Sequence, residues 1–148
     1  MIAKFVFCVM LILGIRMFAN DLNFDLYNAL WAISQVESGG NINAIGKNGE
    51  LGMYQMKPIF VKDINRIIKK ELFKLEDRKD RYMSRRMAEI YLIYYGRIYK
   101  EKTGKNPDIK VYAKMWKYGP YGWLKGDTNY SERVYNIYKD RIFNRSSL

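Results

Sequence analysis

Apolar residues recur every three or four positions along most of the chain, which is the spacing of one face of an α-helix. The first such stripe runs from Leu26 to Ile33 and continues to position 37. A Gly39-Gly40 pair follows, and glycine readily adopts the left-handed conformation of a helix end. The pattern therefore predicts a first helix that ends at Ser38.

Four further stretches with helical spacing follow, separated by polar or glycine-containing segments. The segment from Glu76 to Arg81 has no large apolar residue, so we expect a mobile connection there. The predicted helices begin at Pro58, after a Ser84 cap, at Asn106-Pro107 and at Tyr130, and the last ends at Ile142.

The stretch from Ala44 to Gln55 has a different pattern, with Asn48-Gly49 between two short extended runs. Asn-Gly is a strong signal for the tight turn of a hairpin. The chain has 148 residues, which suits one domain rather than two. The sequence therefore predicts a single, mainly helical domain with a small β-hairpin.

Glu37 is an unusual residue for its position, because it lies on the apolar stripe at the end of the first predicted helix. Partial burial there would disfavour the charged form and raise the proton affinity of the carboxylate, as a general acid requires. The alternative is an ordinary glutamate that faces solvent beside the Gly-Gly stop. The stripe alone leaves both readings open.

The residues from Glu37 onward form a motif of an acid, small residues and an amide. Its members are Glu37-Ser38, Asn41, Ala44, Gly49, Gly52 and Gln55. At this spacing the motif resembles the signature of the soluble lytic transglycosylase and goose-type lysozyme superfamily, in which Glu-Ser ends a helix and Gly-x-x-Gln closes a hairpin. A chance Glu-Ser-Gly would match at far fewer positions.

Two later segments extend the resemblance, which covers about residues 26 to 138. The run from Ala113 to Pro120 looks like the family's alanine-rich helix followed by a Gly-Pro turn. The run from Asn129 to Val134 is similar to the family's closing Asn-Tyr motif. Lys117 stands where the family usually has Asn, so a contact to the sugar is missing or is made differently.

The resemblance implies a lysozyme-like fold with the hairpin beside a catalytic cleft, and cleavage of the MurNAc-β-1,4-GlcNAc bond of peptidoglycan. Glu37 would act as both acid and base and close a 1,6-anhydromuramyl ring. Tyr130 would hydrogen-bond the carboxylate, and Ser38 would orient Glu37 or its helix end. The other residues expected to bind substrate are Met53, Tyr54, Gln55, Lys117 and Tyr118.

The aromatic residues divide into two groups by position. One group falls at helical spacing and is expected to pack in the core: Tyr91, Tyr94, Tyr95 and Tyr112. The other lies in the hairpin or near glycine-rich turns, where rings can line a sugar-binding groove: Tyr54, Tyr118, Tyr121, Trp123 and Tyr130.

Composition narrows the possible chemistry. The chain has no His and one Cys, Cys8, which excludes Ser-His and Cys-His nucleophiles and every His-containing zinc site. Acid-driven glycosidic cleavage needs little beyond carboxylates. We therefore expect an enzyme with no metal and no organic cofactor.

The first 19 residues have the pattern of a signal peptide. Lys4 precedes an apolar run from Phe5 to Ile15, too short to span a bilayer, and Ala19 offers a small residue for cleavage. An uncleaved membrane anchor is the alternative. We expect residues 20–148 to form the domain and to be exported to the periplasm or cell envelope, or secreted.

The formal net charge is +11, which favours an anionic partner. Export favours peptidoglycan in the cell envelope over nucleic acid, and we expect a monomer whose association with a membrane, if any, is peripheral or N-terminal. Two rival functions remain. A hydrolytic muramidase would need a second carboxylate, for which the hairpin offers Glu50 in a turn expected to face solvent. A non-catalytic basic module would bind glycan or nucleic acid without using Glu37.

Overall fold

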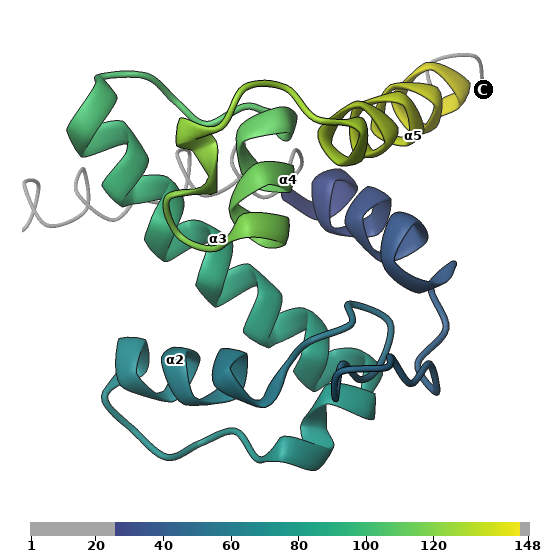
Figure 1. The fold of residues 1–148 in the computed structure, drawn as a ribbon, viewed down its shortest axis with the longest axis vertical. Coiled ribbons are helices and arrows are strands. Elements are labelled where there is room, and N and C mark those ends of the chain that lie inside the picture. Colours follow the sequence, from purple (N-terminus) through teal and green to yellow (C-terminus); the bar gives the residue numbers. More distant parts are fainter. Residues whose placement is uncertain (1–25, 146–148) are drawn as a thin grey trace, which may run out of the picture.

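The computed structural model describes residues 26–145 (Figure 1), so the predicted signal peptide lies outside the described residues. The described part is mainly helical, as predicted. A first helix covers residues 26–38. The later α-helices are α2 (Pro58–Ile68), α3 (Arg81–Thr103), α4 (Ile109–Tyr118) and α5 (Asn129–Arg145), and two short 3-10 helices are η1 (Leu75–Lys79) and η2 (Gly122–Leu124).

The long helix α3 crosses the molecule and separates two groups of elements (Figure 1). On one side it packs against α2 and η1, and on the other against α4, which also packs against α5 and η2. The first helix lies beside α5, and Arg141 of α5 donates a hydrogen bond of 3.0 Å to the side chain of Asn28. The loop after residue 38 leads from this pair of helices to α2.

The first helix ends at Ser38, which confirms the prediction. Gly39 and Gly40 have φ values of 65° and 76°, in the left-handed region. Their N–H groups donate to the carbonyls of Gln35 and Ser34 at 3.0 and 3.1 Å. These bonds satisfy carbonyls that would otherwise be unpaired at the helix end.

The predicted β-hairpin was wrong: the described residues contain no strand there. Residues 41–57 form a loop with two isolated antiparallel bridges, Ile45 to Leu51 and Leu51 to Met56. The chain turns too often for a ladder to extend, because Gly49, Gly52 and Gln55 all have positive φ. Backbone bonds such as Gly52 N–H to Ala44 O, 2.9 Å, brace the loop instead.

The predicted starts of two helices had different outcomes. Pro58 occupies the first turn of α2, as predicted. Helix α3 begins at Arg81 rather than after Ser84, because the Asp80 carboxylate accepts a hydrogen bond of 2.7 Å from the Met83 N–H and caps the helix four residues earlier. Ser84 is buried in the first turns of α3.

The segment predicted to be a mobile connection forms η1 and is anchored by a buried arginine. The guanidinium of Arg78 donates to the carbonyls of Gly49 and Met56 at 3.0 Å each and to its own 3-10 helix. Gly52 faces the Arg78 carbonyl so closely that a Cβ there would lie 1.8 Å from the oxygen. The polar composition of this segment therefore reflects a backbone-binding role, not an open linker.

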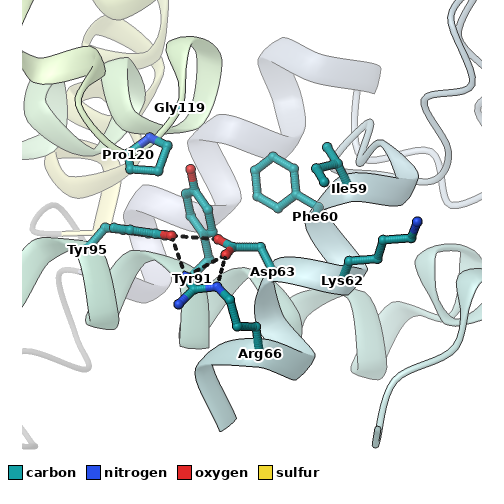
Figure 2. Close-up of a pocket in the computed structure, with 9 residues that line it drawn as sticks. All are labelled: Ile59, Phe60, Lys62, Asp63, Arg66, Tyr91, Tyr95, Gly119 and Pro120. Atoms are coloured by element: carbon teal, nitrogen blue, oxygen red, sulfur yellow. Dashed lines mark hydrogen bonds and ion pairs between the residues drawn. The ribbon is translucent and has the colours of Figure 1, made fainter. Parts of the chain in front are cut away.

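The start of α4 is close to the prediction. Asp108, directly after Asn106-Pro107, caps α4 through a 2.8 Å bond from the Val111 N–H. Trp116 of α4 is the centre of an aromatic cluster, with ring centroids 4.8 Å from Phe60, 5.7 Å from Tyr54 and 5.9 Å from Tyr91. Phe60 and Tyr91 appear side by side in Figure 2.

The aromatic residues at helical spacing pack as predicted. Tyr91, Tyr95 and Tyr112 are buried, and the half-buried Tyr94 packs against the core. Among residues 26–145, no helix combines the length and apolarity needed to cross a membrane.

Candidate active site

Glu37 lies on the last turn of the first helix, where its side chain is half-buried against α5. The hydroxyl of Tyr130, on the first turn of α5, donates a hydrogen bond of 2.7 Å to Glu37 Oε1. This bond joins two segments 93 residues apart in the chain. The acid therefore sits where the first helix, its following loop and α5 converge.

The surroundings of Glu37 raise its pKa above the ordinary value for a glutamate. Burial is the largest cause, because a charged carboxylate loses hydration there, and the negative charge of Glu50 acts in the same direction. The Tyr130 hydroxyl and the positive charges of Lys117 and Arg133 oppose the shift but do not cancel it. The carboxyl group can therefore hold a proton at higher pH than an exposed glutamate.

Tyr130 is placed to remain a hydrogen-bond donor. Burial and the neighbouring Glu37 carboxylate raise the pKa of its hydroxyl, so the phenol keeps its proton. The ammonium of Lys117 lies 5.2 Å from the Tyr130 ring centroid, within cation–π range. Lys117 thus sits beside the Glu37–Tyr130 pair, although its own side chain is exposed.

Ser38 connects the end of the first helix to the following loop. Its hydroxyl donates to the carbonyl of Met53 at 2.8 Å and accepts the Asn41 N–H at 3.0 Å. The residue next to Glu37 is therefore fixed to two points of the loop. This arrangement suits the role of orienting the helix end.

Gln55 braces the loop from inside. Its side-chain amide donates to the carbonyls of Gly52 at 2.9 Å and Ala44 at 3.3 Å. The amide nitrogen is therefore occupied by the loop. Any contact between Gln55 and a substrate would use the amide oxygen or follow from the shape of the loop.

Three other predicted binding residues have different environments. Tyr54 is 2% exposed and packs against Trp116, so its ring belongs to the core and does not line a groove. Met53 is also buried, and its carbonyl is engaged by Ser38. Tyr118 is 40% exposed at the end of α4, with Lys125 5.2 Å from its ring centroid.

Glu50 does not face solvent as predicted: 19% of its side chain is exposed. One carboxylate oxygen accepts the Asn48 N–H at 2.8 Å, and the other lies 3.4 Å from the ammonium of Lys57. The hydrogen bond from the Asn48 N–H is the largest of the effects that lower the Glu50 pKa. Glu50 is thus an ionised group held within its own loop.

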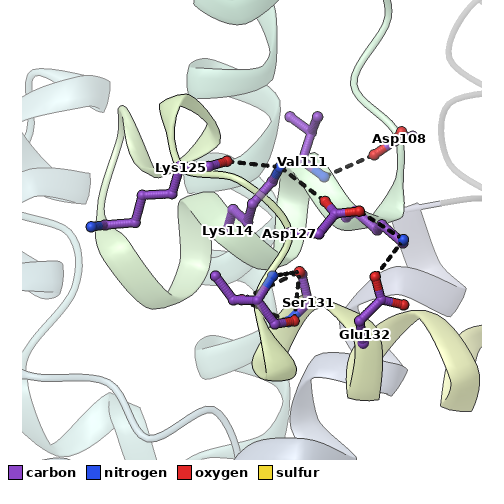
Figure 3. A network of polar contacts seen from close by, with 9 residues as sticks. Asp108, Val111, Lys114, Lys125, Asp127, Ser131 and Glu132 are labelled. Carbon is purple, nitrogen blue, oxygen red and sulfur yellow. Dashed lines mark hydrogen bonds and ion pairs between the residues drawn. The ribbon is translucent and has the colours of Figure 1, made fainter.

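The start of α5, which carries Tyr130, is held by a network of charged side chains (Figure 3). Asp127 accepts from Lys110 at 2.9 Å and from the buried Lys114 at 3.3 Å, and Lys110 also donates to Glu132 at 2.6 Å. Lys114 further donates to the carbonyl of Lys125 at 3.1 Å. The network links α4 to the loop and first turn of α5.

Sequence reasoning missed this network because its members are far apart in the chain. The one available signal was Lys114, a charged residue within the apolar run of α4. A lysine there must find partners, because an unpaired buried charge is costly. Among the described residues, no group of three or more Cys, Asp and Glu side chains is arranged to hold a metal ion.

The fold and the site define a helical domain built around one acid at a helix end, with a tyrosine hydroxyl bonded to it. The family model for the Transglycosylase SLT domain matches residues 19–109, and the chain belongs to this family. Membership implies a peptidoglycan substrate. The matched range includes Glu37, Ser38 and Gln55, whereas Lys117 and Tyr130 follow it. No curated protein matches the chain.

Proposed function

We propose that this protein is a peptidoglycan lytic transglycosylase that cleaves the MurNAc-β-1,4-GlcNAc bond and leaves a 1,6-anhydromuramyl end. The observation that carries the proposal is the half-buried Glu37, whose pKa is raised by burial and whose Oε1 accepts the Tyr130 hydroxyl at 2.7 Å. Family membership supplies the substrate class.

The first step uses Glu37 as a general acid. The protonated carboxyl group donates its proton to the glycosidic oxygen that leaves with GlcNAc, and the bond from that oxygen to C1 of the muramyl residue breaks. The raised pKa favours this step, because more of the acid form is present near neutral pH. Tyr130 holds Oε1 in place while the other oxygen, Oε2, is available to carry the proton.

The second step uses the resulting carboxylate as a base. It takes the proton of the muramyl C6 hydroxyl, and the C6 oxygen bonds to C1 to close the anhydro ring. Glu37 then carries a proton again, so the cycle needs no added water. Because the nucleophile belongs to the reacting sugar, proximity replaces a second catalytic carboxylate.

Tyr130 also affects how easily Glu37 gives up its proton in the first step and takes one back in the second. Its hydrogen bond stabilises the ionised form of Glu37, and Lys117 acts in the same direction by its charge. Burial acts against both. The opposed effects suit a residue that must give a proton and then take one back.

A hydrolytic muramidase is the second candidate function, and Glu50 is the observation that favours it. The Glu37 pKa is raised while the Glu50 pKa is lowered, and such opposed shifts occur in acid and base pairs. However, both carboxylate oxygens of Glu50 are engaged, by Asn48 and by Lys57. A base that activates water would first have to give up one of these contacts.

The sequence pattern of residues 1–19 supports export, and the net charge of +11 supports attraction to the anionic polymer of the cell envelope. We place the enzyme there as part of the proposal. A non-catalytic binding module would use the charge but would not require the acid or its bond to Tyr130.

Replacing Glu37 by Gln tests the proposal with little change in shape. Wall degradation by Glu37→Gln is expected to fall by at least the roughly 10² to 10⁴-fold that positioned acid–base catalysis contributes. The matched control is Glu101→Gln, an exposed residue of α3, which should retain wild-type activity. Clearing of purified sacculi by Glu37→Gln within a few-fold of wild type, with an unchanged circular dichroism spectrum, would show that Glu37 is not the catalytic acid; a wild-type protein that binds sacculi without clearing them would favour the binding module.

A further inference from the structure

A recess lies apart from Glu37, between α2, α3 and the turn that follows α4 (Figure 2). Its volume is about 440 Å³, within the roughly 300 to 1,000 Å³ range typical of small-ligand sites. Neither Glu37, Tyr130 nor Gln55 lines it. The residues that shape it most are Phe60, Asp63, Arg66, Tyr91, Tyr95 and Pro120.

The wall of this pocket is aromatic and firmly packed. The Phe60 and Tyr91 ring centroids are 4.5 Å apart, and those of Tyr91 and Tyr95 are 4.7 Å apart. Trp116 supports Phe60 and Tyr91 from the core. Such a wall is formed before any ligand arrives, which lowers the entropic cost of binding.

One end of the pocket is polar and carries a cation. Arg66 donates to Asp63 Oδ1 from Nε at 2.9 Å and from Nη2 at 2.6 Å, and to the Tyr95 hydroxyl at 3.1 Å. Tyr95 in turn donates to Asp63 Oδ2 at 2.7 Å. These contacts, drawn in Figure 2, satisfy Asp63 on both oxygens, while 59% of the Arg66 side chain remains exposed.

The charges of the pocket favour an anionic ligand. The lining has two cations, Arg66 and Lys62, and one carboxylate, Asp63, which is paired with Arg66. The Lys62 ammonium points away from the aromatic wall (Figure 2), so Arg66 is the cation nearest to it. Nε and Nη2 of Arg66 are engaged by Asp63 and Tyr95, so a ligand carboxylate would bind through Nη1 by a charged hydrogen bond. A neutral sugar would gain little from this excess of positive charge, and the aromatic wall offers few polar partners for its hydroxyl groups.

One short turn of the chain connects the pocket to residues of the candidate active site. Gly119 and Pro120 line the pocket, and they follow directly after Lys117 and Tyr118 in the chain. Lys117 lies over the ring of Tyr130, which is bonded to the catalytic acid. Through this turn, a branched polymer bound at Glu37 would extend a side branch into the pocket.

We propose that this pocket binds the acidic peptide branch of the wall polymer while its glycan strand lies at Glu37. The aromatic wall would receive the small apolar side chains of the peptide, and Arg66 would bind a carboxylate. This inference rests on the proposed function, since it assumes a glycan substrate that carries peptides. It makes the pocket a determinant of specificity for peptide-bearing strands.

The test compares two forms of the same soluble glycan: strands that keep their peptides, and strands from which an amidase has removed them. The variant Arg66→Gln removes the cation but keeps an exposed polar side chain. Its KM for peptide-bearing strands, relative to that for peptide-free strands, should rise roughly five- to tenfold, as expected for an exposed charged hydrogen bond. The matched control is Arg86→Gln, because Arg86 is also exposed, at 57%, and ion-paired within its helix, but lies outside the pocket.

Direct binding provides a second readout that does not depend on catalysis. The free peptide released by the amidase should perturb the NMR signals of Phe60 and Tyr91 in Glu37→Gln, and the further change Arg66→Gln should weaken this binding. An unchanged KM ratio together with no perturbation of these signals would overturn the proposal. Failure of the proposed function would look different, since the wild-type enzyme would then cleave neither form of the strand or would release only reducing ends.

Discussion

The hydrogen bond from Tyr130 to Glu37 gives the most informative single perturbation, Tyr130→Phe. The substitution removes one hydroxyl from a 2.7 Å contact and leaves the ring that packs beneath Lys117. That hydroxyl lowers the Glu37 pKa, so its removal should raise the pKa further above the ordinary glutamate value. A hydrogen bond to a charged group contributes about 1.5 to 3 kcal/mol, which corresponds to roughly one to two pH units.

The pH dependence of activity follows from the sign of this shift. Wild-type activity should decline at high pH as Glu37 loses the proton that the first step needs. In Tyr130→Phe this decline should move to higher pH by roughly one to two units. At the optimum, kcat should fall by at most roughly 10- to 100-fold, because the acid is less well held and the ionised form less stabilised.

The assay is a pH–rate profile on soluble glycan strands, with titration of Glu37 followed by carbon NMR in both proteins. Circular dichroism shows whether the variant is folded. A decline that stays in place or moves to lower pH, with the Glu37 titration unchanged, would refute the reasoning. It would mean that the hydroxyl contact does not control the charge of the acid.

Three further predictions concern stability and wall binding. Because the folded-state pKa of Glu37 is raised, its ionisation should destabilise the fold as pH rises above about 4.5. In denaturant unfolding, Glu37→Gln should therefore increase the free energy of unfolding more at pH 8 than at pH 4, and an equal increase at both would contradict the shift. Gly52→Ala should lower the free energy of unfolding by about 2 kcal/mol or more, since a Cβ there meets the Arg78 carbonyl and φ is 77°. The control Gly126→Ala has open space around it and should leave the free energy of unfolding nearly unchanged. Pelleting of the protein with sacculi should weaken as salt rises, because exposed charges act over only about 8 Å at physiological ionic strength, and salt-independent pelleting would exclude the basic surface as the cause.

Much of the helical frame could be predicted from local signals. Gly39-Gly40 and Pro58 act within one turn of the chain, so their effects on helix ends are visible in the sequence. Ser84 was a wrong cap because Asp80, four residues earlier, competes for the same role. The hairpin prediction failed since Gly52 and Gln55 also take positive φ, which a two-residue turn rule does not anticipate.

In the candidate site, the position of the acid could be predicted from local sequence, whereas its distant partners could not. The position of Glu37 on an apolar stripe follows from periodicity, and its burial supports that reading. Its neighbour Tyr130 was predicted from family resemblance, because nothing local relates residues 93 positions apart. The same limit explains why the partners of Arg78 and Lys114 were not predicted, since each side chain is buried and bonded to backbone at least 11 residues away.

Product analysis tests the central claim most directly. Glycan fragments released from purified sacculi by the wild-type enzyme can be weighed by mass spectrometry, with Glu50→Gln digested in parallel. The account predicts 1,6-anhydromuramyl ends, lighter by one water than reducing ends, from both proteins. Reducing ends alone from the wild type, with Glu50→Gln as inactive as Glu37→Gln, would contradict it and establish hydrolysis with Glu50 as the second carboxylate.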